Sequence, residues 1–253
     1  MSRAGEPVLE LRDLHKSFAE TPIIRGVTLV VRRGQRHGLI GPNGAGKSTL
    51  FNLISGQFAP TSGDILLNGQ SIAGVPPYLI NRRGLSRSFQ ITNLFPRMSV
   101  AENLRIAVMG HHGHRFTLFR PVANLRRVSS RVDEHLEKLR LQHRRNDMAG
   151  DLAYSEQRAL EIGMALATDP EILLLDEPTS GMSRDESAYV VELIREVTEG
   201  KTLLVVEHDM SVVFDLCDHT SVLVYGQILA SGAPETVRAD RRVQEAYLGE
   251  EAA

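Results

Sequence analysis

The N-terminal part of the chain carries short apolar runs bounded by proline, glycine and charged residues, a pattern typical of β-strands. Three such runs predict strands over residues 8–11, 26–31 and 36–40. Another apolar run, at 64–70, ends in the dipeptide Asn68-Gly69, which favours a two-residue hairpin turn. We therefore expect antiparallel hairpins beside a parallel core in this part of the chain.

Apolar residues at helical spacing predict a helix over 47–55, with Gly56 as its C-terminal cap. From 100 to about 146 the pattern is helical and rich in Arg and His, which indicates an inserted helical lobe. One face of this lobe is apolar at helical spacing. The residues of that face are Leu125, Val128, Val132, Leu136 and Leu139.

The second half of the chain alternates helices and strands. A helix is expected over 155–167, a continuously apolar strand over 171–176, a helix over 184–198 and a strand over 202–206. A strand that is apolar throughout is typical of the buried centre of a parallel sheet. The alternation therefore predicts an α/β fold with parallel strands and crossover helices, followed by a frayed end at 250–253.

Composition narrows the class of protein. The chain has 253 residues, 29 Lys and Arg against 31 Asp and Glu, and one cysteine, Cys217. A net charge of −2 argues against nucleic-acid binding driven by charge alone, and one cysteine excludes a disulfide framework. No apolar run approaches the roughly 20 residues of a membrane-spanning helix, and the polar start predicts no secretory signal.

A glycine-rich segment between the strand at 36–40 and the helix at 47–55 matches the phosphate-binding loop (P-loop) pattern. Glycines allow several backbone N–H groups to face one anion, and the helix adds its positive N-terminal end. Lys47 supplies a cation for the β- and γ-phosphates, and the Ser48 hydroxyl is suited to Mg²⁺. The nucleotide-binding residues expected here are Gly41, Pro42, Asn43, Gly44, Ala45, Gly46, Lys47, Ser48 and Thr49.

Two acidic residues end the apolar strand at 171–176. Asp176 is expected to hold Mg²⁺, and Glu177 is expected to orient and deprotonate the attacking water. An Asp-Glu pair at a strand end can also be a simple solvated turn. The P-loop and the following Pro178 favour the catalytic interpretation.

Three histidines, His111, His112 and His114, lie in a glycine-flanked stretch of the lobe. They could bind a metal ion or form a solvated loop. Because no carboxylate or cysteine accompanies them, the sequence favours the solvated loop.

With these residues in place, the chain resembles the nucleotide-binding subunit of ATP-binding cassette (ABC) transporters over nearly its whole length. The landmarks occur in order: the P-loop, Gln90, the segment 152–158, Asp176-Glu177 and His208. The resemblance implies one ABC ATPase domain over 1–253. It would combine a P-loop core with an antiparallel β subdomain, at 1–90 and 168–253, and a helical lobe with the signature, at 91–167.

The resemblance also implies individual roles. Gln90 would contact Mg²⁺ or the attacking water, and His208 would hydrogen-bond the γ-phosphate of ATP. Phe18 would stack on adenine. Phe18 could instead be an ordinary core phenylalanine. His208 could instead be a strand-end histidine whose hydrogen bonds are satisfied within the fold.

In similar proteins the signature segment binds the γ-phosphate of ATP held by the opposite subunit. Here it would comprise Ala153, Tyr154, Ser155 and Glu156, with Ser155 opening a helix. The family pattern has Ser at the position of Ala153 and Gly at that of Ser155. Because Ala153 lacks a hydroxyl donor, we expect a weakened but retained contact. The loop at 181–183 also departs from the family pattern.

Sequence details resemble the larger ATPase subunit of branched-chain amino acid importers, whose relatives import urea, amides or aromatic acids. A lipid exporter ATPase and a soluble ABC ATPase without a transport role are the alternatives. The resemblance implies a second ATPase subunit, two membrane permeases and a solute-binding protein outside the membrane, with no nucleic acid. The paired subunits of such importers favour a heterodimer over a homodimer, at the cytoplasmic face of the membrane.

Overall fold

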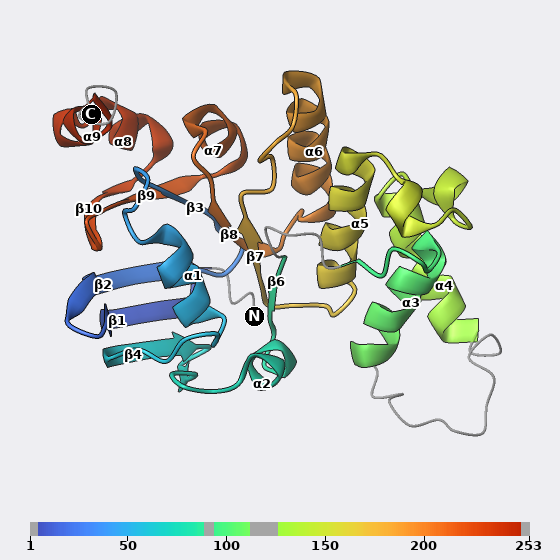
Figure 1. The fold of residues 1–253 in the computed structure, drawn as a ribbon, viewed down its shortest axis with the longest axis horizontal. Helices are drawn as coiled ribbons and strands as arrows, with labels where there is room; N and C mark the ends of the chain where they lie inside the picture. Colours follow the sequence, from blue (N-terminus) through green and yellow to red (C-terminus); the bar gives the residue numbers. More distant parts are fainter. Residues whose placement is uncertain (1–4, 89–93, 112–125, 249–253) are drawn as a thin grey trace. The chain divides into compact units, whose positions relative to one another are not determined.

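The computed structural model describes residues 5–88, 94–111 and 126–248 (Figure 1). The chain divides into two compact units. The core unit comprises Met1–Arg87, Glu171–Glu177 and Gly200–Ala253, and the helical unit comprises Ser88–Pro170 and Pro178–Glu199. None of the described helices is long and apolar enough to cross a membrane.

The first sheet of the core unit is antiparallel, with the strand order β2-β1-β4-β5. Its strands are β1 (Pro7–Phe18), β2 (Thr21–Arg32), β4 (Ser62–Leu67) and β5 (Gln70–Ser71). The first two extend beyond the predicted 8–11 and 26–31, because a register shift beside Asp13 lets β1 continue past its charged residues. The hairpin predicted at Asn68-Gly69 is confirmed: both residues have positive φ, and β4 pairs with β5.

The second sheet has the strand order β10-β9-β3-β8-β7-β6 and is parallel except for the β9–β10 pair. Its strands are β3 (Arg36–Ile40), β6 (Leu85–Arg87), β7 (Ile172–Asp176), β8 (Thr202–Val206), β9 (His219–Val224) and β10 (Gln227–Gly232). All residues of β7 and β8 are buried, as the continuous apolar patterns predicted.

One hydrophobic core joins the two sheets of the core unit through α1 (Lys47–Ile54). Leu50, Phe51 and Ile54 of α1 share this core with residues of both sheets, so the helix that follows the P-loop is firmly packed. The other helices of this unit are α2 (Pro77–Arg82), α7 (Met210–Leu216), α8 (Pro234–Ala239) and α9 (Arg241–Leu248).

The helical unit contains α3 (Val100–His111), α4 (Arg126–Lys138), α5 (Tyr154–Leu166) and α6 (Arg184–Val197), with short 3-10 turns at Gln142–Arg144 and Ala149–Asp151. The predicted apolar face is confirmed at Val128, Val132, Leu136 and Leu139, which are buried in this unit's own core. Leu125 lies outside the described residues, as do His112, His114 and the end expected to fray.

The two units divide the chain differently from the expected boundaries at 91–167 and 168–253. The segment Pro178–Glu199, which contains α6, belongs to the helical unit. The physical reason is packing: Leu193 of α6 lies in the core that α3, α4 and α5 also form, and α6 packs against α5. His111 is the last residue of α3 rather than part of a loop.

Candidate nucleotide site

The P-loop connects β3 to α1 in a conformation that requires glycine. A Cβ atom on Gly41 would lie 2.1 Å from the carbonyl oxygen of Leu223, so no larger residue fits there. Gly46 caps α1 with a φ of 104°, a backbone conformation that L side chains rarely adopt. These two glycines therefore bring the chain into the first turn of the helix at the position the sequence predicted.

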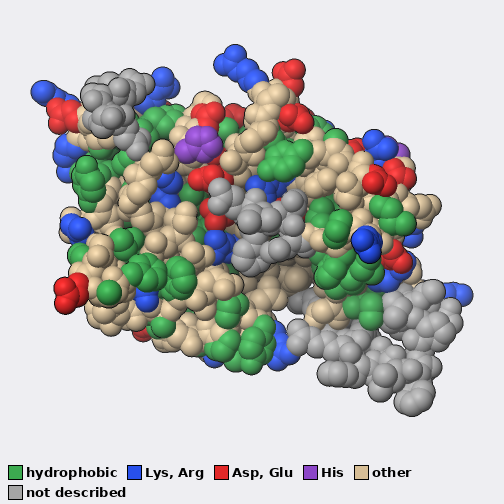
Figure 2. Space-filling view, viewed as in Figure 1, with side chains coloured by type: hydrophobic (Ala, Val, Ile, Leu, Met, Phe, Trp, Pro, Cys, Tyr) green, Lys and Arg blue, Asp and Glu red, His purple; other side chains and the backbone are tan. Residues whose placement is uncertain are grey.

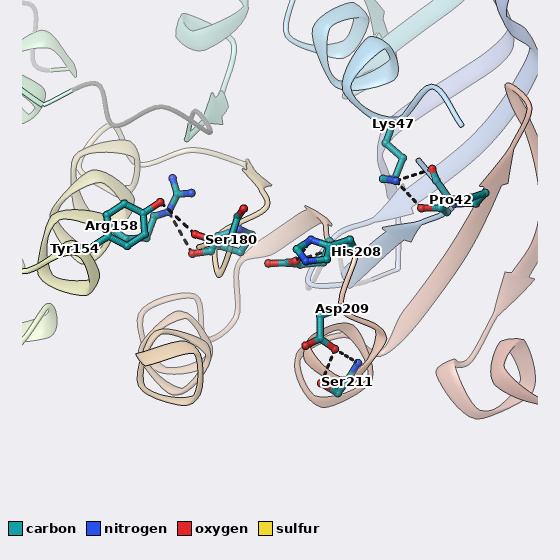
Figure 3. Close-up of polar contacts among 11 residues, drawn as sticks. Pro42, Lys47, Tyr154, Arg158, Ser180, His208, Asp209 and Ser211 are labelled. Atoms are coloured by element: carbon teal, nitrogen blue, oxygen red, sulfur yellow. Dashed lines mark hydrogen bonds and ion pairs between the residues drawn. The ribbon is translucent and has the colours of Figure 1, made fainter. Parts of the chain in front are cut away.

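Lys47 folds back over its own loop (Figure 3). Its Nζ donates to the carbonyl oxygens of Gly41 at 2.5 Å and Pro42 at 2.9 Å, and the residue is only 7% exposed. Within the described chain, the N–H groups of Gly44 and Gly46 have no acceptor. A fixed cation and amides without an acceptor at a helix start are the features that bind a phosphate group.

The remaining P-loop residues differ in exposure. Asn43, Gly44 and Ser48 are exposed, Thr49 is half-buried, and Ala45 is buried with its N–H bonded to the carbonyl of Pro42. The Ser48 hydroxyl therefore faces solvent in the first turn of α1, where it is available to a ligand.

The register of the parallel sheet brings the predicted catalytic segments to one edge. Val206 of β8 is paired with Leu39 of β3 on one side and with Asp176 of β7 on the other. The P-loop, the Asp176-Glu177 pair and His208 each follow one of these strands. Since adjacent strands lie about 4.8 Å apart, all three segments leave the same short stretch of sheet edge.

Asp176 and Glu177 have different environments. Asp176 is the last residue of β7 and is 4% exposed. Glu177 is half-buried, and its φ of 44° is unusual for a residue with a side chain. Its N–H donates to the carbonyl oxygen of Val206 at 2.9 Å, which holds this turn in place. The turn therefore separates a buried carboxylate from a more accessible one.

Arg87 is a buried partner of Asp176 that the sequence predictions missed. It ends β6, and its Nη2 donates to Oδ2 of Asp176 at 2.6 Å, with both side chains less than one-tenth exposed. Its Nη1 donates to Asn52 Oδ1 and Ser55 Oγ, each at 2.8 Å. β6 has the sequence Leu85-Ser86-Arg87 with a single apolar residue, and the partner of Arg87 lies 89 positions away, so no local pattern in the sequence marks this pair.

His208 follows β8 and its side chain is 58% exposed. Its Nδ1 lies 3.5 Å from Oε2 of the fully buried Glu207 (Figure 3). The next residue, Asp209, caps α7 by accepting from the Ser211 hydroxyl at 2.6 Å and from the Ser211 N–H at 2.8 Å. These hydrogen bonds, that of the hydroxyl above all, hold the pKa of Asp209 below its usual range. His208 is thus an exposed donor on a fixed turn.

Phe18 ends β1 and is 42% exposed. Its ring meets Phe58 edge-on, with ring centroids 5.3 Å apart, and the Lys16 Nζ lies 5.0 Å from the Phe18 centroid. It is therefore not a fully buried core residue, and an exposed ring suits stacking on a base. Gln90 lies outside the described residues.

The signature segment begins α5 in the helical unit. The helix starts at Tyr154, with Ala153 as its N-cap, one residue before the predicted start at Ser155. The side chain of Ala153 has no oxygen to accept a hydrogen bond. The Glu156 carboxylate caps the turn instead, accepting from Ala153 N–H at 3.0 Å. Ala153 is exposed and Ser155 is half-buried.

Two contacts tie α5 to the loop before α6 (Figure 3). The Tyr154 hydroxyl donates to the carbonyl oxygen of Ser180 at 3.2 Å, and the Nε of Arg158 donates to that of Pro178 at 3.2 Å. Arg158 is 1% exposed and also pairs with Glu161 at 2.8 Å. The signature helix is therefore hydrogen-bonded to residues 178–180, which directly precede the loop at 181–183.

The donor chemistry of the core unit fits Mg²⁺. The described residues contain no group of three His, Cys, Asp or Glu that could hold a metal ion by themselves. A serine hydroxyl and one carboxylate are hard oxygen ligands of the kind that bind Mg²⁺ together with substrate phosphates. Ser48, in the first turn of α1, and Asp176, the last residue of β7, are such a pair. The P-loop that leads to Ser48 leaves the sheet at the edge where Asp176 lies.

Comparison with known proteins gives matches over almost the whole chain. The ABC transporter family model matches residues 24–180, and that of the branched-chain amino acid ATP-binding cassette transporter matches residues 227–253. The high-affinity branched-chain amino acid transport ATP-binding protein BraF of Pseudomonas aeruginosa is 40% identical over 254 residues, covering 97% of this chain and 99% of BraF. Its counterpart LivG of Escherichia coli is 39% identical over 255 residues, covering 97% of this chain and 99% of LivG.

Solved structures agree. A nucleotide-free ATP-binding cassette from an ABC transporter has a TM-score of 0.83 and 28% identity, covering 96% of this chain and 99% of that one. An ABC transporter cassette in its ADP conformation has a TM-score of 0.82 and 28% identity, with the same coverage. The fold, the ordered motifs and these matches lead to one conclusion: this chain belongs to the ABC transporter ATPase family.

Proposed function

We propose that this chain binds Mg²⁺-ATP at the edge of its parallel sheet and hydrolyses it to power the import of branched-chain amino acids. The observation that carries the catalytic part is the strand register, which aligns the P-loop, Asp176 and the turn before His208 on three adjacent strands. The relationship to BraF and LivG, and the C-terminal match at residues 227–253, support the transported substrate.

The residues divide the reaction between binding and chemistry. Lys47 and the P-loop amides hold the β- and γ-phosphates, and the Phe18 ring stacks on adenine. Ser48, Asp176 and Gln90 would hold Mg²⁺, which neutralises phosphate charge when bound. Glu177 accepts a proton from the attacking water, and His208 donates to the γ-phosphate. Water attack on the γ-phosphorus breaks its bond to the bridging oxygen and releases ADP and phosphate.

A second cassette completes each site. Ala153, Tyr154, Ser155 and Glu156 of one subunit would approach the γ-phosphate bound by the other, so that ATP binding closes the pair and hydrolysis reopens it. Because Ala153 offers only backbone donors there, a partner with an intact serine would give a stronger site. This favours a heterodimer with a second ATPase subunit over a homodimer.

The helical unit carries an apolar surface suited to the permease. Phe95, Ile106 and Met148 are 46%, 39% and 48% exposed, and apolar side chains appear on this face over α3 (Figure 2). The buried side chain of Asn103 holds the backbone at Phe95 in place. It accepts from the Phe95 N–H at 2.8 Å and donates to the Phe95 carbonyl oxygen at 3.1 Å. A fixed, exposed apolar surface favours contact with a short helix of a membrane partner.

Copurification and uptake test this proposal together. The tagged chain is expressed with its neighbouring genes and extracted from membranes in mild detergent. It should copurify with two permeases and a second ATPase subunit. Before extraction, it should be found at the cytoplasmic face of the membrane. Cells lacking the chain should recover leucine uptake with the wild type and not with Glu177→Gln. Recovery of urea, amide or aromatic-acid uptake instead would reassign the substrate, and a chain that copurifies with no permease would contradict the transport role.

A further inference from the structure

Asp176 is the buried carboxylate of the site, and it already has a cationic partner within the chain. The Arg87 Nη2 lies 2.6 Å from its Oδ2, and the two side chains are 8% and 5% exposed. Charges buried this deeply interact strongly, because little water screens them. Any cation that approaches Asp176 therefore encounters a carboxylate whose charge is largely compensated.

Arg87 is held rigidly from the other side by α1. Its Nη1 donates to Asn52 Oδ1 and to Ser55 Oγ, each at 2.8 Å, and its guanidinium lies 5.5 Å from the Phe51 ring centroid. Ser55 is in turn fixed by its own bond to the Phe51 carbonyl at 2.8 Å. With its guanidinium anchored to α1, Arg87 orients Asp176 rather than following it.

We propose that Arg87 is the resident counter-ion of Asp176 and sets how much Mg²⁺ the nucleotide site requires. Its bond to Oδ2 fixes the carboxylate and lowers the negative potential available to a metal ion. Asp176 alone is therefore a weak metal ligand, and Mg²⁺ is retained chiefly when nucleotide phosphates add their own charge. This inference rests on the proposed function, in which Asp176 is a metal ligand.

The test is a Mg²⁺ titration of nucleotide binding, which requires no hydrolysis. The full-length chain is mixed with fluorescent MANT-ADP, and the Mg²⁺ concentration that gives half of the fluorescence change is measured. Arg87→Met and Arg87→Gln remove the charge and should lower this midpoint about tenfold, since the uncompensated carboxylate attracts the cation more strongly. Arg83→Met, which removes an exposed arginine of the same unit, should leave it unchanged.

Arg87→Lys keeps the charge and should hold the midpoint within about twofold of the wild type. Arg87→Lys also tests the proposal if the charge-removing variants do not fold. A tenfold shift of the Mg²⁺ midpoint in Arg87→Lys overturns the proposal. An unchanged or raised midpoint in Arg87→Met overturns it as well.

Asp176→Asn separates this inference from the function on which it rests. If Asp176 is the metal ligand, this variant raises the Mg²⁺ midpoint. A raised midpoint in Asp176→Asn with no shift in Arg87→Met overturns the role of Arg87 alone. A midpoint that Asp176→Asn leaves unchanged overturns the proposed metal role of Asp176, and the counter-ion role falls with it.

Discussion

Two helices of this chain, α1 and α5, begin at segments expected to bind phosphate, and they prepare their N-termini differently. α1 follows Gly46, has no acidic residue in its first turn, and has a buried lysine at its first position. α5 follows Ala153, and Glu156 in its first turn accepts from the Ala153 N–H. The first turn of α1 is left positive for an external anion, whereas that of α5 is partly neutralised from within.

This difference indicates unequal contributions to ATP binding. The P-loop supplies the charge and most of the donors for the phosphates held by its own subunit. The signature can add only backbone N–H groups and the Ser155 hydroxyl to the phosphate of a partner. We therefore expect changes in the core unit to have large effects and changes at the signature to have small ones.

The largest effect is expected from Glu177→Gln, which removes the proton acceptor and leaves the shape of the site intact. Turnover should fall about 100-fold to 10,000-fold, the range that a general base contributes. ATP binding and ATP-dependent dimerisation should persist, because neither needs proton transfer. Steady-state phosphate release and analytical ultracentrifugation measure the two properties.

The matched control is Glu235→Gln, an exposed carboxylate of α8 in the same unit, which should retain wild-type turnover. Rapid hydrolysis by Glu177→Gln would remove this residue from the base role and place the chemistry elsewhere in the site.

The second prediction concerns acid stability, for which the two units also differ. Burial, and then the nearby His219, lowers the pKa of His37 to about 3. In the helical unit, burial and then Lys138 lower the pKa of the less deeply buried His135. A depressed histidine pKa means that the unfolded chain binds the proton first, so this stability is complete above about pH 6.5 and is lost as pH falls toward 3.

Between pH 7.5 and pH 5, His37 should account for about 2 kcal/mol of lost unfolding free energy. His37→Gln, which cannot be protonated, should show a correspondingly shallower pH dependence in urea unfolding. The control is the exposed His143→Gln, with the wild-type slope expected. Equal slopes for the wild type and His37→Gln would contradict the assigned pKa shift.

The smallest effect is expected from Ala153→Ser at the signature. α6 shows what the substitution should create: Ser183 Oγ accepts from Glu186 N–H at 3.4 Å, while the Glu186 carboxylate accepts from Ser183 N–H at 2.9 Å. The new hydroxyl should stabilise α5 by about 1 kcal/mol as an N-cap. It should also strengthen ATP-dependent dimerisation about threefold to tenfold, the range of one hydrogen bond.

Ultracentrifugation in the Glu177→Gln background measures this gain without hydrolysis, and Ser155→Gly tests whether the Ser155 side chain limits the approach of the phosphate. If Ala153→Ser changes neither ATPase activity nor dimer affinity, the missing hydroxyl is not what weakens the signature.

What the sequence predicted depends on local information. The P-loop is a run of consecutive residues whose glycines, lysine and flanking strand and helix are all visible in one short segment. The same is true of the Asn68-Gly69 hairpin and of the apolar strand β7. The lengths of the strands were harder to predict from the sequence. β1, for example, continues past Asp13, which has a positive φ.

What the sequence could not give depends on distant contacts. The pairing of Arg87 with Asp176 joins two strand ends that lie far apart in the chain and meet only when β6 and β7 pair. The boundary that the resemblance implies places α6 in the core at 168–253, whereas the packing of Leu193 groups α6 with the helical unit. α5 begins at Tyr154, one residue before the predicted Ser155, and the Glu156 carboxylate caps its first turn.

The ATP affinity of Lys47→Met tests the central claim most directly, namely that a lysine fixed on its own P-loop is the main phosphate ligand of this chain. Methionine keeps the buried volume and removes the charge, so affinity for MANT-ATP should fall about 100-fold while the circular dichroism spectrum stays unchanged. Lys138→Met, on the exposed face of α4, should bind as the wild type does. Wild-type affinity in Lys47→Met would contradict the account.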